Sequence, residues 1–195
     1  MPCHYGPVSR PDQPDVPLIL PRLEGAALSL RAFQSDDVDA IRDAGRDPLI
    51  PLMTTVPAGA DEEQALAFIR RQHDRLRQRA GYSFAIADAD DVAIGQIGLW
   101  LRDERHGRAS IGYWLRPSAR GRGHAAAALA VLRDWACTLP QLNRLELYVE
   151  PWNEASWRTA ERAGFVREGL MRSWQIVDGT PRDMYMYSLL TATRR

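Results

Sequence analysis

The sequence predicts a mixed α/β domain built on a central, largely antiparallel sheet of about six to seven strands, with helices on both faces. Several segments alternate apolar and polar residues at the period of a β-strand, and short polar turns join them into runs. Segments of helical period separate other strands, and one such helix forms a crossover that makes its two flanking strands parallel. Antiparallel runs together with one crossover predict a mixed sheet.

The first part of the chain predicts one strand and two helices. Residues 28–33 alternate as a strand, and Ser35 is placed to cap a short helix that continues through Ala44. Residues 47–57 carry prolines among apolar residues, so we expect an apolar loop there, of the kind that often contacts substrate. Residues 61–79 predict a longer helix, because acidic residues open it and arginines crowd its end.

The rest of the chain predicts a meander, a crossover helix and a final hairpin. The strands of the antiparallel meander are expected at 82–87, 92–101 and 108–116. The later elements are expected as a helix over 121–138, a strand over 145–149, a helix over 153–163, and strands over 165–177 and 183–190. Asn153 is placed to cap the second of these helices, and Gly164 to end it.

Composition indicates one domain and gives no general reason to bind nucleic acid or membrane. The 195 residues are 45% hydrophobic and 26% charged, which suits a single ordinary core. The 25 basic and 25 acidic side chains cancel, so overall charge favours neither nucleic acid nor an anionic membrane. Residues 1–21 are dense in proline, and we expect a loosely ordered arm there, ahead of one domain over 22–195.

Cysteine content and hydropathy predict a cytoplasmic protein. Cys3 and Cys137 are the only cysteines, which argues against a disulfide framework or a cysteine-based metal site, and we expect no metal. No apolar run approaches the roughly 20 residues that cross a bilayer. The N-terminus has prolines where a signal peptide has its apolar segment.

The turn that follows the third meander strand predicts an anion site. That strand ends at Pro117, and a helical run of Ala, Leu and Val begins soon after it. The residues between them read Arg120-Gly121-Arg122-Gly123-His124-Ala125. A glycine-rich turn that opens a helix brings unpaired N–H groups and the positive helix end together, so we expect phosphate there. No Gly-Lys-Ser/Thr follows, which excludes a nucleotide-triphosphatase loop.

This hexapeptide matches Gln/Arg-x-x-Gly-x-Gly/Ala, and over residues 20–192 the chain resembles the GNAT superfamily of acyl-CoA-dependent N-acyltransferases. Within it, the chain is most similar to the ribosomal-protein N-terminal (alanine/serine) acetyltransferases. The segments that carry this closer resemblance are Ile111-Gly112-Tyr113-Trp114-Leu115, Asn153-Glu154-Ala155-Ser156, Glu161-Arg162-Ala163-Gly164-Phe165, Glu168-Gly169, and Asp183 with Tyr187.

The resemblance implies a GNAT fold and transfer of an acetyl group from acetyl-CoA to a primary amine. The fold would splay the fourth strand, 108–116, from the fifth, 145–149. Attack would be direct, in a ternary complex, and the acceptor would be the N-terminal α-amine of a protein. The alternatives are a small amine, such as an amino acid, polyamine or antibiotic, and a catalytically weak acyl-CoA-binding sensor. Acyl-chain preference is open, and so is a homodimer, for which no residue argues.

The resemblance also assigns residues to acetyl-CoA. The N–H groups from Gly121 to Ala125 would face the diphosphate, and Arg120 or Arg122 would add charge. His124 is expected on the surface of this loop. The cofactor would lie against the backbone of Trp114, Leu115 and Arg116, and Asn153 would bind the pantetheine arm. One N–H, assigned to Leu115, would polarise the thioester carbonyl. Ser156 would protonate the departing thiolate.

The base is where the chain departs from the family pattern. Many members have glutamate directly before Ile-Gly-Tyr, whereas this chain has Ser110, and serine at its ordinary pKa is no base. The candidate replacements are Glu104, His106, Glu146, Tyr148 and water. Three tryptophans occupy positions where polar residues would be expected and are candidates to wall an acceptor pocket: Trp100, Trp152 and Trp174.

Overall fold

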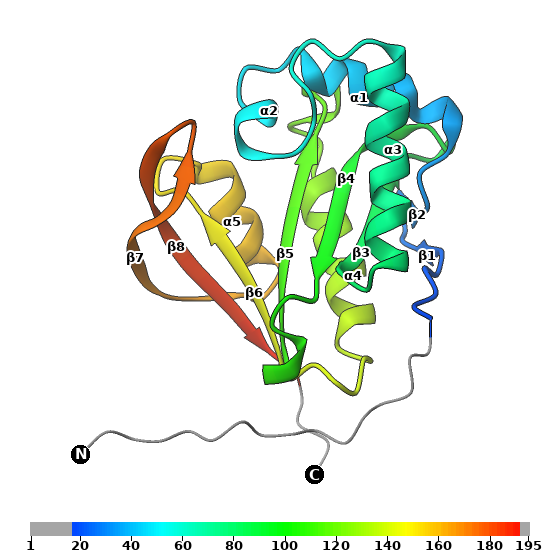
Figure 1. The fold of residues 1–195 in the computed structure, drawn as a ribbon. Coiled ribbons are helices and arrows are strands. Elements are labelled where there is room, and N and C mark those ends of the chain that lie inside the picture. The colour runs from blue at the N-terminus through cyan, green and yellow to red at the C-terminus, as the bar shows by residue number, and fades with distance from the viewer. Residues whose placement is uncertain (1–16, 192–195) are drawn as a thin grey trace, which may run out of the picture.

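The computed structural model describes residues 17–191 and has one eight-stranded sheet with the order β1-β2-β3-β4-β5-β6-β8-β7 (Figure 1). The strands are β1 (Leu23–Glu24), β2 (Ser29–Arg31), β3 (Gly81–Ala87), β4 (Ala93–Trp100), β5 (Arg108–Leu115), β6 (Arg144–Val149), β7 (Val166–Val177) and β8 (Thr180–Leu190). The helices are α1 (Val38–Gly45), α2 (Ile50–Met53), α3 (Glu62–Arg77), α4 (His124–Ala136) and α5 (Glu154–Arg162). Short 3₁₀ turns are η1 (Ser35–Asp37), η2 (Glu104–His106) and η3 (Pro117–Ala119).

Helices cover both faces of the sheet, as the sequence predicts. α1, α2 and α3 lie on one face, and α4 and α5 lie on the other (Figure 1). Leu129 and Leu132 of α4 bury fully in the larger core cluster between the sheet and α4. Phe68 of α3 and Ile41 of α1 bury fully in the smaller cluster on the opposite face. Each helix is held by its apolar face, which is the usual source of helix stability in a domain.

The sheet opens between β5 and β6. These strands pair in parallel from Arg108 with Arg144 to Ile111 with Leu147, and the pairing stops there. Beyond this point β5 stays paired with β4, and β6 stays paired with β8, so the two strands diverge (Figure 1). The splay leaves the backbone from Gly112 onward unpaired on its β6 side. The expected fold class, including this splay, is confirmed, but the sheet has eight strands rather than the expected six to seven, because the two-residue β1 adds to its edge beside β2.

Local sequence signals explain where two helices begin. Asp61 accepts from the N–H of Gln64 at 2.8 Å, and the Gln64 side chain accepts from the N–H of Asp61 at 3.1 Å, which is a capping box at the start of α3. Asn153 caps α5 by accepting from the N–H of Ser156 at 3.2 Å, as the sequence predicts. Ser35 is not a helix cap; it lies inside η1, whose cap position is Gln34.

One short helix was not expected. Residues 47–57 were predicted to be a loop without regular helix, but they contain α2. Pro51 stands in its first turn, where the missing N–H costs nothing. Asp47 accepts from the N–H groups of Leu49 and Ile50 at 2.9 and 3.0 Å, and Thr54 donates to the carbonyl of Ile50 at 2.7 Å. Side-chain bonds to the backbone thus support a single turn.

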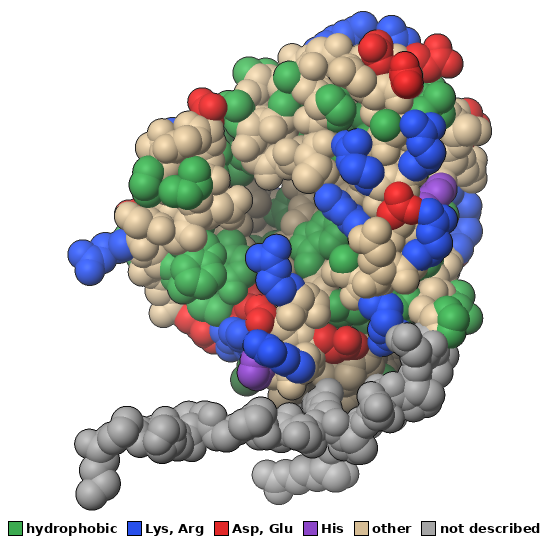
Figure 2. Space-filling model, viewed as in Figure 1, with side chains coloured by type: hydrophobic (Ala, Val, Ile, Leu, Met, Phe, Trp, Pro, Cys, Tyr) green, Lys and Arg blue, Asp and Glu red, His purple; other side chains and the backbone are tan. Residues whose placement is uncertain are grey.

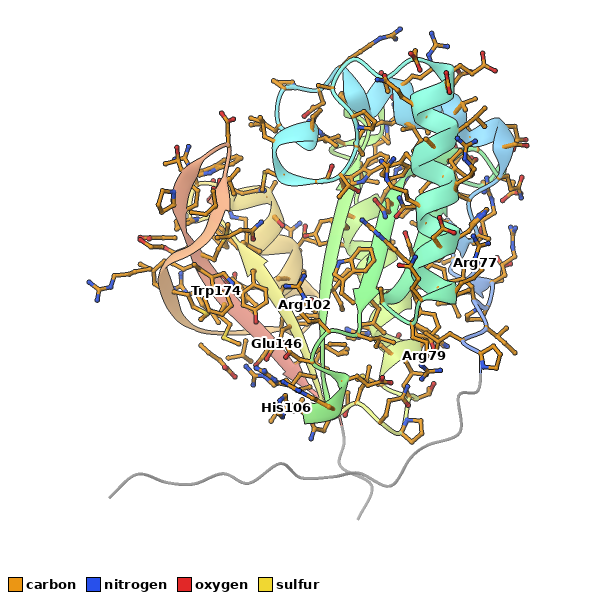
Figure 3. The ribbon with its side chains drawn as sticks, in the orientation of Figure 1. Arg77, Arg79, Arg102, His106, Glu146 and Trp174 are labelled. Carbon is orange, nitrogen blue, oxygen red and sulfur yellow. The ribbon has the colours of Figure 1, made fainter. Side chains whose placement is uncertain are left out.

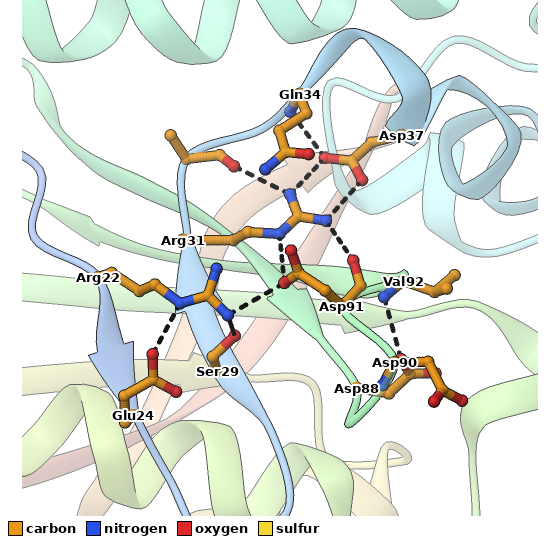
Figure 4. Close-up of polar contacts among 11 residues, drawn as sticks. Arg22, Glu24, Ser29, Arg31, Gln34, Asp37, Asp88, Asp90, Asp91 and Val92 are labelled. Carbon is orange, nitrogen blue, oxygen red and sulfur yellow. Dashed lines mark hydrogen bonds and ion pairs between the residues drawn. The ribbon is translucent and has the colours of Figure 1, made fainter.

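A buried ion-pair network joins the N-terminal strands to the β3–β4 turn (Figure 4). The guanidinium of Arg31 binds both oxygens of Asp37 at 2.8 and 2.9 Å, and its Nε donates to Asp91 at 2.9 Å. The N–H of Gln34 donates to Asp37 at 2.8 Å. Because Arg31 is buried and every partner is a hydrogen-bond acceptor, this bidentate pair fixes β2 and η1 against the turn.

The expected boundary of the N-terminal arm divides a packed segment. Leu18 and Leu20 pack on the larger core cluster, so the chain contributes to the core before residue 22. The remainder of the expected arm, residues 1–16, lies outside the described residues. We propose that the domain begins at residue 17 or 18.

Candidate active site

Two glycines shape the turn before α4. Gly121 and Gly123 have φ angles of 75° and 80°, in the left-handed region where a side chain is strained. A Cβ atom on either glycine would meet no protein atom within 4 Å, so the space above the turn is open. Gly123 is also the N-cap of α4, and it has no side chain to accept from the first helical N–H groups.

The backbone donors at the start of α4 face this open space. Within residues 17–191, the N–H groups of residues 121–126 donate to no protein acceptor. The helix begins its own ladder with the N–H of Ala127, which donates to the carbonyl of Gly123 at 3.1 Å. Uncapped N–H groups and the positive end of a 13-residue helix suit a phosphate group. The turn therefore fits the diphosphate that the sequence predicts.

Arg120 is taken up by protein contacts. Its guanidinium binds Asp47 at 2.8 Å, and its Nε donates to the carbonyl of Leu115 at 3.1 Å. Burial would raise the pKa of Asp47, but hydrogen bonds from the N–H groups of Leu49 and Ile50, together with Arg120, hold that pKa below its ordinary value. Asp47 therefore stays ionised and ties the turn to α2.

The remaining side chains of the turn stay closer to its surface. Arg122 is exposed and makes no ion pair within the part of the chain that the structure describes. His124 and Ala125 are half-buried in the first turn of α4. The Nδ1 atom of His124 is buried and has no hydrogen-bond partner among the described residues. Arg122 is thus better placed than Arg120 to add charge for a phosphate.

The edge of β5 presents Leu115 to the splay. The N–H of Arg116 donates to the carbonyl of Ile94 next to β4, at 3.0 Å. Because backbone groups alternate sides along a strand, the N–H and carbonyl of Leu115 point the other way, toward the splay. The Trp114 side chain is buried and donates from Nε1 to Gln96 at 2.7 Å. Of the three residues expected to face the cofactor by their backbone, Leu115 is thus the one whose N–H faces the splay.

A tyrosine that the sequence reasoning missed contacts Ser156. The hydroxyl groups of Tyr113 and Ser156 lie 2.9 Å apart, and Tyr113 also donates to the Ser156 carbonyl at 3.2 Å. Burial raises the pKa of Tyr113, so its phenol is protonated at neutral pH. The pair spans from β5 to the first turn of α5 across the splay. The sequence signal that indicates this contact is the alternation of side chains along β5, which places Tyr113 on the α5 face of the sheet.

Glu146 is buried on the opposite face, beside the position of the missing acid. It is the register partner of Ser110. Its carboxylate accepts from Arg144 at 2.7 Å, from Arg108 at 3.4 Å and from the Tyr148 hydroxyl at 2.8 Å. Burial, reinforced by Glu146, raises the pKa of Tyr148, so that phenol is a proton donor at neutral pH. Glu146 is thus engaged by Tyr148 and by two arginines.

The other two candidate bases lie far from the splay. Glu104 and His106 belong to η2, next to the beginning of β5, whereas the splay opens along the second half of that strand (Figures 1 and 3). The side chain of His106 contacts its neighbour Arg105 at 3.1 Å. The sequence placed these residues beside β5 correctly, but it did not distinguish the closed end from the open end.

Two of the three tryptophans flank the α3 face of the splay. The ring of Trp100 packs directly on Gly98, where a Cβ atom would lie only 2.3 Å from that ring. The guanidinium of Arg75 lies 4.8 Å from the centre of the Trp100 ring. Trp174 stacks on Tyr148 with centroids 5.4 Å apart (Figure 3). This face is hollowed between α3 and the β7–β8 hairpin, with apolar side chains inside and arginines at the rim (Figure 2). The third, Trp152, is 54% exposed and donates to Glu150.

Neither a metal centre nor a membrane span is found in the described chain. Among residues 17–191, no group of three or more His, Cys, Asp and Glu side chains is arranged to hold a metal ion. None of the helices in that range is both long and apolar enough to span a bilayer.

Sequence comparison identifies relatives over most of the chain. Residues 27–166 match the family described as acetyltransferase (GNAT) domain. The chain is 34% identical to the uncharacterized N-acetyltransferase p20 of Bacillus licheniformis over 165 residues, which are 84% of this chain and 92% of that protein. It is 28% identical to the uncharacterized N-acetyltransferase YoaA of Bacillus subtilis over 173 residues, 88% and 98% of the two chains.

Solved structures share the fold. RimL, the ribosomal L7/L12 α-N-protein acetyltransferase in complex with coenzyme A, superposes with a TM-score of 0.74 at 19% identity and covers 89% of this chain and 99% of its own. Spermidine N-acetyltransferase from Vibrio cholerae, in complex with CoA and spermine, has a TM-score of 0.70 at 21% identity, over 85% and 96% of the two chains. At these identities the likeness is one of fold.

Proposed function

The chain belongs to the GNAT acetyltransferase family, and we propose that it transfers an acetyl group from acetyl-CoA to a primary amine, with the N-terminal α-amine of a protein as acceptor. The observation that carries this proposal is the open turn before α4, whose N–H groups at residues 121–126 donate to no other part of the described chain. It lies at the end of the strand that borders the splay. A ligand with a diphosphate and a long arm suits both features.

The proposal assigns roles to the residues around the splay. The N–H groups from Gly121 to Ala125, with Arg122, bind the diphosphate, and Asn153 binds the arm. Leu115 donates its N–H to the thioester carbonyl, where negative charge develops during acyl transfer. Ser156 supplies a proton to the sulfur atom. When bound, acetyl-CoA supplies the activated acetyl group.

The shape of the α3 face supports a peptide acceptor. An α-amine at the end of a protein must reach the splay with several residues attached, so it needs an open approach rather than a closed pocket. The hollow between α3 and the β7–β8 hairpin is open to solvent (Figure 2). The solved relatives include one named for a ribosomal protein and one named for spermidine, so a small polyamine is the second candidate acceptor.

The test combines binding with turnover. Acetyl-CoA is titrated into the protein by calorimetry, and free thiol is then followed with serine- and alanine-initiated peptides, spermidine and free amino acids. We expect binding, and thiol release with the peptides, with mass spectrometry locating the acetyl group on the α-amine. The matched control is each peptide with its N-terminus already acetylated, which should release no thiol.

Each other outcome has a distinct meaning. Turnover with spermidine or amino acids alone would replace the peptide acceptor by a small amine. Acetyl-CoA binding without turnover on any amine would favour a sensor, the alternative suggested by Ser110. A protein that binds no acyl-CoA would overturn the proposal altogether.

A further inference from the structure

Glu150 is a buried carboxylate with one unsatisfied oxygen. It follows the last residue of β6, and only 4% of its surface is exposed. One of its oxygens, Oε2, accepts from Nε1 of Trp152. The other, Oε1, is buried and has no hydrogen-bond partner within residues 17–191. The nearest cation, Arg182, places its Nε 3.8 Å from Oε1, beyond hydrogen-bonding distance.

This carboxylate lies at the open end of the splay. Alternation along β6 puts Glu150 on the same face as Glu146 and Tyr148, which is the face hollowed for the acceptor. The β5–β6 pairing ends at Leu147, so Glu150 stands on the unpaired stretch. The carbonyl of Glu150 accepts from the N–H of Asn153 at 2.9 Å. The same turn therefore holds Glu150 and the start of α5, where Ser156 lies.

The pocket around Glu150 is large enough for an amine. It measures about 390 Å³ and is lined by Glu150, Pro151, Trp152, Pro181, Arg182 and Asp183. Arg182 is half exposed, with 49% of its side chain accessible, so its long side chain can move aside from Oε1. A buried carboxylate oxygen without a donor is costly, and a charged N–H donor relieves that cost best.

The other carboxylates on this face are already engaged. Glu146 accepts from Arg144, Arg108 and Tyr148. Asp183, at the rim of the pocket, accepts from the N–H of Ser173 at 2.8 Å. Among the described residues, Glu150 is therefore the carboxylate with a buried oxygen that receives no hydrogen bond.

We propose that Glu150 binds the ammonium group of the acceptor and removes its proton, which is the role of the family glutamate whose position Ser110 occupies in this chain. This inference rests on the proposed function. Oε1 takes one proton from the ammonium group, and the amine that remains is neutral and carries a free electron pair. That pair forms the bond to the thioester carbon as the carbon–sulfur bond breaks. The nitrogen loses a second proton, and the sulfur gains one through Ser156, so the products are an amide, a free thiol and one proton passed from Glu150 to solvent.

The experiment compares Glu150→Gln with two variants of the same chain. The acceptor is a serine-initiated hexapeptide amide, and kcat/KM is measured from pH 7 to pH 9. We expect Glu150→Gln to lower kcat/KM by about 100-fold at pH 7, the usual scale for losing a general base. An α-amine has a pKa of about 7.7–8.0, so it deprotonates itself by pH 9, and the deficit should shrink by about tenfold. This variant leaves the surrounding charged or titratable groups unchanged: Arg182 and Asp183 line the pocket, and Glu146 and Tyr148 lie on the same face of β6.

The other two variants separate this role from a structural one. Glu104→Gln removes a carboxylate far from the splay and should leave kcat/KM unchanged. Arg182→Gln removes the neighbouring cation. If Glu150 and Arg182 form only a structural ion pair, the two variants should lose kcat/KM equally and by the same factor at every pH, whereas a base at Glu150 confines the pH-dependent loss to Glu150→Gln. Acetyl-CoA affinity by calorimetry should be the same in all three, which reports that the fold and the cofactor site are intact.

The contrary results are equally definite. Glu150→Gln with wild-type kcat/KM at pH 7, or with a deficit that is the same at every pH, would overturn the inference while the proposed function stood. A Glu150→Gln protein that no longer binds acetyl-CoA would assign Glu150 to the structure of the turn. Wild-type protein that binds acetyl-CoA and acetylates neither the peptide nor spermidine would overturn the proposed function, and this inference with it.

Discussion

Pairs of polar side chains set the chemistry of the splay at the scale of single residues. Ser156 alone has an exchangeable proton and no fixed direction for it, since a hydroxyl group rotates freely. Tyr113 removes that freedom, because its phenol is protonated, buried and 2.9 Å from the Ser156 hydroxyl. Asp47 acts similarly on Arg120, whose guanidinium it holds at 2.8 Å. The hydrogen-bonding partner of each residue that matches the family pattern therefore determines whether that residue is available to a ligand.

Replacing Tyr113 with phenylalanine tests the first of these pairs. The change removes one hydroxyl and leaves the ring in its place, so Ser156 loses a partner worth about 1 kcal/mol. If Ser156 protonates the thiolate, we expect kcat to fall roughly fivefold to tenfold, with little change in KM for acetyl-CoA. Steady-state kinetics on the best acceptor measure both constants.

Ser156→Ala provides the comparison for Tyr113. It should lower kcat further, and adding Tyr113→Phe to it should have almost no additional effect, because the two side chains act as one unit. Independent, additive losses would show that Tyr113 supports the fold of this region rather than the serine.

At the scale of elements, the strand-turn-helix unit of β5 and α4 builds the proposed cofactor site. β5 ends at a 3₁₀ turn that contains a proline. Gly121 and Gly123 then lie in left-handed conformations, and α4 begins without a side-chain cap. A helix normally satisfies its first N–H groups with a cap. Here the missing cap leaves those donors to a ligand, which is a local departure from stability in favour of binding.

Gly123→Ala tests how this turn affects stability and ligand binding, and Gly179→Ala is its matched control. Both glycines have positive φ, 80° and 69°, and neither has protein atoms within 4 Å of a Cβ position, but Gly179 lies in the β7–β8 turn. We expect each variant to lose about 1–2 kcal/mol of unfolding free energy from backbone strain. Urea unfolding measures that loss.

Of these two variants, only Gly123→Ala should weaken the binding of acetyl-CoA. A methyl group on Gly123 enters the space proposed for the diphosphate, so we expect acetyl-CoA affinity to fall by roughly tenfold or more, the equivalent of one or two lost hydrogen bonds. Gly179→Ala should bind as wild type does. Equal affinity in both variants would place the diphosphate elsewhere.

At the scale of the whole molecule, the sheet separates the face proposed for the cofactor from the face proposed for the acceptor, and the splay connects them. α4 and α5 cover one face and carry the turn, Asn153 and Ser156, while the hollow lies on the face of α3 (Figures 1 and 2). β5 and β6 pair below the splay, so the sheet is closed there. A cofactor and an acceptor that bind on opposite faces can meet without either having to leave first, which suits direct transfer in a ternary complex.

Truncation from the N-terminus tests where the folded domain begins. Leu18 and Leu20 pack on the core, whereas the proline density of residues 1–16 predicts a loosely ordered arm. We expect removal of residues 1–16 to change the unfolding free energy by no more than about 0.5 kcal/mol. Removal of residues 1–21 should lower it by about 1–3 kcal/mol, because two leucine side chains lose their burial.

The two truncations also report on function. Acetyl-CoA binding should survive both, since no residue of the proposed site precedes Asp47. Loss of stability or binding on removing residues 1–16 alone would make that segment part of the domain.

Much of this protein follows from local sequence signals. Alternation predicted each long strand, Asn153 and Asp61 marked their helix starts, and the spacing from Arg120 to Ala125 predicted the turn and its family. These signals are readable because strand period, capping and left-handed glycine conformations depend on neighbours within a few residues. The number of strands and the single turn of α2 were less predictable, since they depend on pairing with distant segments and on bonds to Asp47.

The tertiary structure alone decided which polar groups meet. The partners of Ser156, Arg120 and Glu146 come from 43, 73 and 38 residues away along the chain in the contacts with Tyr113, Asp47 and Arg108. No local pattern encodes such contacts, because they depend on how segments that are distant in the sequence pack together. The turn after β6 likewise leaves Glu150 buried, with one oxygen that receives no hydrogen bond. The sequence by itself therefore determined the family, the fold class and the glycine turn before α4, while packing across the splay determined the surroundings of the groups proposed to act there.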